Sequence, residues 1–353
     1  MLAGAGFIRQ LLWPPFAENG RWLLAALTTL LSVSLTVAAA EVVLRVAQIP
    51  FRVGWIPSEN ALARFDPELG WSYIPGRSHT QAFGASHREV SMHFDALGAR
   101  VGRPGVVHDP TRATVLFVGD SYTMGHGLPY EETFVGRLDG DPGFALQVVN
   151  LGVQAYGTDQ ALLLLERQIG HFRTVAVVYT FIADHVLRNG NDDRRLLIPT
   201  ARFLGTKPLF GLRRDGSLYL RKRAARYEDL WQSSLWNWVR LAWQRHGPAA
   251  DPRLTLALVR RMREVAASRR APLVMVVWRQ GPPQGGVPVI DWADPATSPV
   301  AAGHVVDTGL DPPAGWDTWQ ISGDSHPDAA AHARVARLVK EEFARLGLRA
   351  GSP

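Results

Sequence analysis

The 353-residue sequence contains no cysteine. Disulfide bonds and thiolate metal sites are therefore excluded, and cysteine usage says nothing about the redox compartment. Lysine is almost as scarce, so the formal charge of +6 is carried by arginines spread along the chain. Clusters such as Arg221-Lys222-Arg223 are more typical of solvated faces than of a nucleic-acid patch, and we expect no nucleic-acid partner.

Charge is also missing from one long stretch, the nineteen residues from Trp22 to Ala40. As a helix this stretch would be about 28 Å long, close to the thickness of a bilayer core. We expect one transmembrane helix over about residues 22–44, although Ala38-Ala39-Ala40 leaves a cleavable signal peptide open. Two arginines precede the stretch and two follow it, so the positive-inside count does not set its orientation.

The rest of the chain is expected to form one α/β domain over residues 111–350. Residues 51–110, rich in Pro, Gly, Ser and His, predict an irregular or short-stranded lead-in, and residues 184–250 predict an insertion. Apolar strands alternate with helical stretches, which favours a doubly wound parallel sheet. The expected strands are 114–118, 146–151, 175–182 and 273–278; the expected helices are 133–138, 159–168, 254–268 and 328–346.

Gly119-Asp120-Ser121 ends the first of these strands. Ligands bind at the carboxyl ends of the strands in such a sheet, so Ser121 can present its hydroxyl to a cleft and its backbone N–H to an oxyanion. These residue types also make ordinary turns, so the tripeptide alone is a weak signal.

A serine nucleophile needs a base and an orienting acceptor, and the segment from Ile321 to Pro327 supplies both. His326 and Asp324 lie two residues apart, and Pro327 is expected at the first position of the last helix. The alternative is a simple helix-capping turn. Ser325, in a second Gly-Asp-Ser, is a competing nucleophile, but no strand precedes it.

Together these segments resemble the SGNH, or GDSL-type, serine hydrolase family. The resemblance covers roughly 110–183 and 270–346, and it rests on Gly119-Asp120-Ser121, the block Asn150–Gln160 and Asp324–Pro327, in family order. The segments Glu41–Arg45 and Phe65–Trp71 also resemble membrane-anchored bacterial members. The resemblance implies a flavodoxin-like three-layer α/β/α fold, with Ser121 as nucleophile, His326 as base and Asp324 as its orienting partner. It implies no metal and no organic cofactor.

The resemblance also implies an oxyanion hole, and here the sequence departs from the family. The first donor would be the backbone N–H of Ser121 and the second that of Ala155, where the family usually has glycine. Asp184 stands where an asparagine amide is expected. Loss of one donor costs about 3–4 kcal/mol, and a carboxylate about 3 Å away would add roughly 5 kcal/mol of repulsion, unless Asp184 is protonated or turned away. His185 is a neighbouring donor candidate, although a structural role is more typical.

Two further sets of residues could lie near the site. His126 is expected to be only a loop histidine. Tryptophans at 231, 236, 238 and 243 lie in a predicted helix over 227–246, where packing of a lid is expected and sugar stacking is the alternative. Trp278 and Trp292 could line the same cleft.

The sequence thus predicts a membrane-tethered serine ester hydrolase acting on acyl esters, such as O-acetyl groups, of envelope or extracellular glycans. Its partners would be the ester substrate and the membrane, and its location the bacterial inner membrane with the catalytic domain in the periplasm or outside the cell. Transfer of the acyl group to a polysaccharide hydroxyl remains open, as does an impaired glycan-binding accessory protein of polysaccharide export.

Overall fold

The structure is a computed structural model. It describes residues 16–49, 61–197, 204–227, 233–246, 251–278, 290–292, 294, 298–300, 304–310 and 316–348. The chain divides into two compact units, residues 1–53 with 232–243, and residues 54–231 with 244–353. Trp231 and the first part of the predicted helix 227–246 lie outside the described residues.

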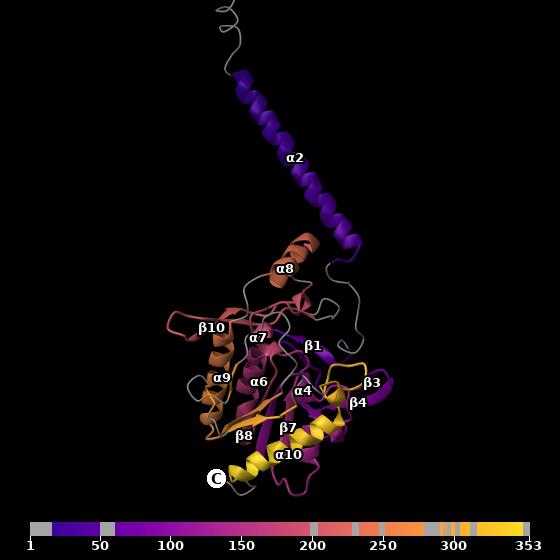
Figure 1. Ribbon diagram of the computed structural model, residues 1–353, viewed down its shortest axis with the longest axis vertical. Coiled ribbons are helices and arrows are strands. Elements are labelled where there is room, and N and C mark those ends of the chain that lie inside the picture. The colour runs from indigo at the N-terminus through magenta and orange to yellow at the C-terminus, as the bar shows by residue number, and fades with distance from the viewer. Residues whose placement is uncertain are drawn as a thin grey trace, which may run out of the picture. The chain divides into compact units, whose positions relative to one another are not determined.

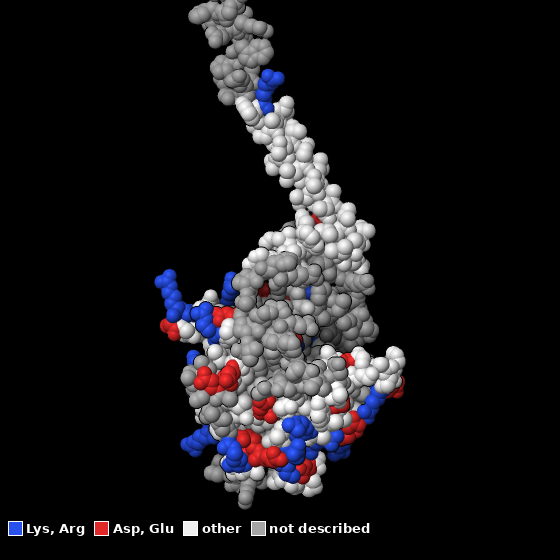
Figure 2. All heavy atoms as spheres, in the orientation of Figure 1, with Lys and Arg blue, Asp and Glu red and all other residues white. Residues whose placement is uncertain are grey.

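The first unit contains the long helix α2 (Phe16–Val46) and the helix α8 (Ser234–His246). Residues Gly20–Val46 are long and apolar enough to cross a membrane, and a signal sequence would pass the same test. Figure 2 shows that most of α2 carries neither acidic nor basic side chains, whereas charged residues are abundant on the other unit. The expected apolar helix is therefore present.

The second unit is built on an eight-stranded sheet with the order β12-β11-β8-β6-β7-β5-β4-β3. Four of its strands, β3, β4, β7 and β8, are labelled in Figure 1. In this order the first five strands, from β12 to β7, are parallel to one another, and β5, β4 and β3 pair antiparallel. The parallel strands are β6 (Ala113–Gly119), β7 (Gln147–Gly152), β8 (Arg173–Phe181), β11 (Leu273–Val277) and β12 (Val305–Asp307). The predicted α/β fold is confirmed, and each predicted strand corresponds to one of these.

Helices cover both faces of the sheet because β6 is apolar on both. Leu116 and Val118 pack in one core with α6 (Thr158–Gln168) and α9 (Pro252–Ala267). Val115 and Phe117 pack in a second core with α5 (Phe134–Asp139) and α10 (Ala329–Arg345). All seven residues of β6 are buried, as expected for a strand covered on both sides.

The lead-in is more regular than expected. It forms a hairpin of β1 (Ala63–Asp66) and β2 (Gly70–Tyr73), and then β3 (Ser78–Phe83), β4 (Arg88–Phe94) and β5 (Arg100–Val101), which extend the central sheet. Of the two forms that the sequence left open, irregular or short-stranded, the described residues of the lead-in take the short-stranded one. Polar residues dominate β3, whose side chains are mostly exposed at the sheet edge, so the apolar pattern of a buried strand is absent.

The segment predicted as an insertion contains α7 (Asp184–Asn189), a short helix η3 (Arg194–Leu196) and a hairpin of β9 (Leu209–Leu212) and β10 (Leu218–Lys222). α7 follows the carboxyl end of β8 directly. It therefore lies at the same edge of the sheet as the end of β6.

Candidate active site

Ser121 is the first residue of the short helix α4 (Ser121–Met124), immediately after β6. The turn requires glycine at 119, because a Cβ there would lie 2.3 Å from Thr123 Oγ1. The Asp120 carboxylate accepts the backbone N–H of Tyr122 (3.0 Å) and so caps the helix. The sharp turn places the serine at the carboxyl end of the parallel strands, as predicted.

His326 and Asp324 meet this serine. His326 Nε2 lies 2.9 Å from Ser121 Oγ, and His326 Nδ1 lies 2.5 Å from Asp324 Oδ1. The loop is closed by the Ile321 N–H, which donates to the His326 carbonyl (2.9 Å), and by the Asp324 N–H, which donates to the Ile321 carbonyl (2.8 Å). The structure thus brings together three side chains that the sequence analysis selected.

The structure settles where α10 begins and which of the two serines, Ser121 or Ser325, contacts His326. The cap of α10 is Asp328, which accepts the backbone N–H groups of Ala330 and Ala331, so the helix begins at Ala329. The expected placement of Pro327 at the first helical position was wrong, since it precedes the cap. Ser325 is exposed, and it is Ser121 that His326 contacts.

The electrostatics of the pair fit a base and its orienting partner. Partial burial would raise the pKa of Asp324, but the hydrogen bond with His326 outweighs it and lowers the pKa to about 2. The carboxylate is therefore ionised near neutral pH and accepts a proton-bearing Nδ1. This tautomer leaves the lone pair of Nε2 directed at the serine hydroxyl.

His126, which was expected to be only a loop histidine, lies against His326 and Asp324. Its ring lies against that of His326, with centroids 4.2 Å apart, and its Nε2 lies 3.7 Å from Asp324 Oδ2. The pKa of His126 is lowered to about 3, mainly by burial and secondly by the nearby His326, so this ring is neutral. His126 therefore packs against one face of the His326 ring and adds no charge there. A histidine five residues after the nucleophile was the only signal in the sequence.

The loop that carries His126 is held by a buried arginine. Arg100 Nη1 donates to the Met124 carbonyl (2.7 Å) and the Gly125 carbonyl (2.5 Å), and Nη2 donates to the Leu128 carbonyl. Because Arg100 belongs to β5, the unexpected lead-in strand positions this loop.

The ligand atoms of His126, Asp324 and His326 lie within 4.8 Å of one another, a spacing that could hold a metal ion. Among the described residues this is the one cluster of that kind, and the contacts within the pair Asp324–His326 account for it without a metal.

A second buried cluster lies behind the nucleophile. Arg188 Nη1 donates to Asp120 Oδ2 (2.8 Å), and His185 Nε2 lies 3.2 Å from the same oxygen. Burial would raise the pKa of Asp120, but His185 and Arg188 lower it to about 2. The other ring nitrogen of His185 pairs with the Tyr179 hydroxyl (2.8 Å), and the side chain is fully buried. His185 is thus a structural residue and not a donor to the oxyanion.

Asp184 does not occupy a buried position. Its side chain is 54% exposed, in the first turn of α7, and lies 3.6 Å from Arg188 Nη2. Its partner in the structure is the cation of Arg188, and its exposed position does not place it as a third donor to an oxyanion.

Ala155 takes the strained backbone that its position implies, with a φ of +63°. Its carbonyl accepts two bonds from the buried Arg194, from Nε (2.9 Å) and Nη2 (2.6 Å). A left-handed alanine costs about 1 kcal/mol or more, so the surrounding contacts must hold the loop in place.

The β1–β2 hairpin supplies further contacts to this loop. Trp71 Nε1 donates to the Gln154 carbonyl (3.0 Å), and the Tyr156 hydroxyl donates to the Trp71 carbonyl (2.5 Å). Gln160 Nε2 donates to the Leu69 carbonyl (2.7 Å). The segment Phe65–Trp71 is therefore a support for the loop that carries Ala155.

A hollow of about 500 Å³ is lined by residues 320–325, which include Asp324. Trp278 and Trp292, expected as cleft-lining residues, are instead buried, at 1% and 4% exposure. Trp278 packs against Tyr122 and Phe134 in the core, so that expectation was wrong. Its position at the end of a buried strand explains why.

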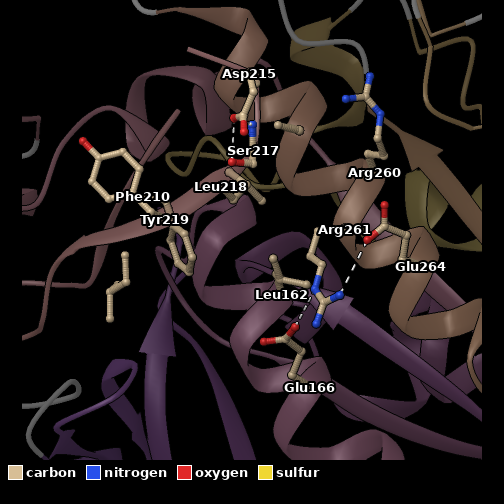
Figure 3. Close-up of a pocket in the computed structure, with 13 residues that line it drawn as sticks. Leu162, Glu166, Phe210, Asp215, Ser217, Leu218, Tyr219, Arg260, Arg261 and Glu264 are labelled. Atoms are coloured by element: carbon tan, nitrogen blue, oxygen red, sulfur yellow. Dashed lines mark hydrogen bonds and ion pairs between the residues drawn. The ribbon is translucent and has the colours of Figure 1, made fainter. Parts of the chain in front are cut away.

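A second cavity of about 570 Å³ lies between the β9–β10 hairpin and the helices α6 and α9 (Figure 3). Arg261 crosses its floor, with Nε 3.0 Å from Glu166 Oε1 and Nη1 3.6 Å from Glu264 Oε2. The residues around it do not include Ser121, Asp324 or His326. Of the two hollows, the one at residues 320–325 includes Asp324, although neither Ser121 nor His326 lines it.

Comparisons with known proteins give similar solved structures but no sequence match. No family model and no curated protein matches the chain. The esterase EstA from Pseudoalteromonas sp. is 13% identical, with a TM-score of 0.38 over 66% of this chain and 97% of that one. The acetylxylan esterase Axe2 from Geobacillus stearothermophilus, in a catalytic mutant, is 14% identical, with a TM-score of 0.33 over 70% and 100%.

A lipolytic protein of the G-D-S-L family from Veillonella parvula is 14% identical, with a TM-score of 0.33 over 66% of this chain and 99% of that one. Of these three structures, this last one carries the family name that the motifs of this chain had indicated. At such low TM-scores they add no argument of their own. The case for a function rests on the sheet topology and on the geometry of the three side chains.

Proposed function

We propose that the chain is a serine ester hydrolase of the SGNH type. The observation that carries the proposal is the continuous contact from Ser121 Oγ through both ring nitrogens of His326 to Asp324. A hydroxyl, a neutral imidazole and an ionised carboxylate in this order are what an activated serine requires. The hollow at residues 320–325, which includes Asp324, would be the route by which an ester reaches Ser121.

The reaction proceeds in two steps. Ser121 Oγ attacks the ester carbonyl carbon while His326 Nε2 takes the hydroxyl proton, and Asp324 stabilises the imidazolium that forms. The tetrahedral intermediate collapses as His326 returns the proton to the departing alcohol oxygen, which leaves an acyl-serine. Water then attacks the acyl carbon with His326 as base, and the carboxylic acid leaves with Ser121 restored.

The oxyanion would be stabilised by two backbone donors, the N–H groups of Ser121 and Ala155. Asp184, exposed and paired with Arg188, supplies no third donor in this scheme. The lack of that donor lowers turnover by about 10²–10³ relative to a three-donor site. An active but slow esterase is the expected result.

The substrate class that we favour is an O-acyl group, such as acetyl, on an envelope or extracellular glycan. The long apolar helix supports this, because we propose that α2 anchors the chain in the bacterial inner membrane with the catalytic unit on the periplasmic side. The position of the hollow next to an exposed loop would admit an acyl group attached to a large alcohol. Transfer to a glycan hydroxyl would use the same acyl-serine.

Turnover of a short chromogenic ester by the full-length protein in detergent tests the proposal. We expect slow release of the chromophore that is lost in Ser121→Ala and retained in the matched variant Ser325→Ala. Absence of turnover in the unaltered protein at every pH would favour the non-catalytic glycan-binding protein. An acceptor glycan that becomes acylated in the same assay would favour the transferase.

A further inference from the structure

The helix α8 presents its apolar face outward. Trp236, Trp238, Val239 and Trp243 are all exposed, with 58%, 49%, 41% and 68% of their surface accessible. Asn237 and Leu241, one turn apart, are the buried members of the helix among the residues whose side chains are described. At 100° per residue, the exposed residues together with Leu235 and Ala242 form one apolar arc.

An outward apolar face of this kind needs an occupant. Three large indoles exposed on one 13-residue helix, about 20 Å long, are costly in water. Tryptophan is favoured at the boundary of a bilayer, where the ring is buried and its N–H remains near water and headgroups. The chemistry of the face therefore fits the interface of a membrane.

The first turn of α8 is bound to the end of the apolar stretch of α2. Glu41 accepts hydrogen bonds from the Ser233 hydroxyl (2.8 Å) and from the backbone N–H groups of Ser234 (2.9 Å) and Leu235 (2.9 Å). These N–H groups are among those that a helix leaves unsatisfied at its start. A carboxylate on one helix thus caps another that follows it by almost two hundred residues.

The position of Glu41 sets the depth of this junction. It is the first charged residue after the nineteen uncharged residues 22–40, and Arg45 Nε lies 2.5 Å from it. Charged side chains at the end of a spanning helix lie at the headgroup level. If α2 spans a bilayer, α8 begins at that level.

We infer that α8 is an interfacial helix, which lies in the headgroup region of the bilayer that α2 crosses, with Trp236, Val239 and Trp243 facing the acyl chains. The inference rests on the proposed membrane span and is independent of the esterase assignment. The sequence analysis expected these tryptophans to pack a lid on the core or to stack on sugar; the exposed face favours lipid instead. Catalytic ester cleavage would then take place on a protein held to the membrane at two points.

The absence of cysteine makes this testable at single positions. A nitroxide is attached at Trp243→Cys or Val239→Cys in the full-length protein, with one copy per lipid nanodisc. Matched labels are placed at Leu30→Cys, in the middle of the apolar stretch, and at Val107→Cys, an apolar residue of the catalytic unit that is 89% exposed. Collision with oxygen, which concentrates in lipid, is compared with collision with a water-soluble nickel complex.

We expect the ratio of oxygen to nickel collisions at 239 and 243 to be several-fold higher than at 107 and lower than at 30. A ratio at 239 and 243 equal to that at 107 overturns the inference. So does protection from both reagents, which would mean that protein covers the face. A water-like ratio at 30 overturns the proposed span, and the inference with it, while leaving the esterase assignment intact.

Discussion

The methyl group of Ala155 is strained by the backbone conformation at that position. Its φ of +63° lies in the left-handed region, where a Cβ is strained and glycine is not. We expect Ala155→Gly to raise the free energy of unfolding by about 1 kcal/mol, because the strain outweighs the extra freedom of glycine in the unfolded chain. Urea denaturation measures the change, and hydrolysis should remain within about twofold because the N–H is kept.

A loss of stability in Ala155→Gly would mean that the alanine methyl contributes packing greater than its strain. The side chain is only 7% exposed, so the methyl group has neighbours whose contacts glycine would lose. Arg194, which binds the carbonyl of residue 155, is the same in the unaltered protein and in Ala155→Gly. The two proteins therefore differ only in the methyl group.

A second prediction about a single residue concerns Asp184. Since its carboxylate is exposed and lies beside Arg188, replacing it with an amide removes a weak ion pair and little else. We expect Asp184→Asn to leave the turnover of a chromogenic ester within about threefold, with the same dependence on pH. An extension of activity toward alkaline pH in the variant would contradict this, because it would identify Asp184 as a donor that must be protonated.

At the scale of elements, Asp120 joins β6, α4 and α7. It caps α4 through the Tyr122 N–H and binds Arg188 of α7. Removing one partner of a buried charged pair costs about 3–5 kcal/mol, because the other charge remains buried. We expect Asp120→Asn to destabilise the fold by an amount in this range, as measured by urea denaturation at pH 7.

The same residue predicts a dependence on pH. The pKa of Asp120 is lowered from 3.8 to about 2 in the folded protein. Ionised Asp120 therefore contributes fully to the free energy of unfolding above about pH 4. This contribution is lost as the pH falls through about 2, since the carboxyl takes up its proton first in the unfolded state. Between pH 5 and 3 the unaltered protein should begin to lose its advantage over Asp120→Asn; an advantage that stays constant down to pH 2 would contradict the shift.

The sequence predicted the elements whose pattern is local. The apolar run before Gly119 and the Asp328-capped helix after His326 are continuous in the chain, so the nucleophile, base and acid could be named from them. The strands β3–β5 could not, because polar edge strands lack the buried pattern and their pairing is set by distant residues. Arg100 was missed, and His126 was expected to be only a loop histidine, for the same reason: their roles depend on contacts between segments far apart in the sequence.

At the scale of the whole molecule, the chain combines a helix able to cross a membrane with an α/β unit that holds the proposed active site. We propose that everything after α2 lies on the periplasmic side. A phosphatase that is active only after export, fused behind Pro353, should therefore be active in bacterial cells, and the fusion should stay with the membranes after carbonate washing. A fused fluorescent protein that matures only in the cytoplasm would contradict the topology if it were bright.

A cleaved signal peptide would give a different result in the same cells. The fusion would be soluble, and its mature chain would begin near Glu41. Since Glu41 caps α8, such a chain would also expose the tryptophan face without its anchor.

The central claim is that Ser121 is the nucleophile of a working triad, and covalent labelling tests it most directly. A fluorophosphonate reacts with a serine only when a base activates the hydroxyl, so it reports the first chemical step without a choice of substrate. We expect labelling of the full-length protein on the peptide that contains Ser121, equal labelling of Ser325→Ala, and none of Ser121→Ala or His326→Ala. Labelling that persists in folded Ser121→Ala, or none in the unaltered protein, would contradict the account.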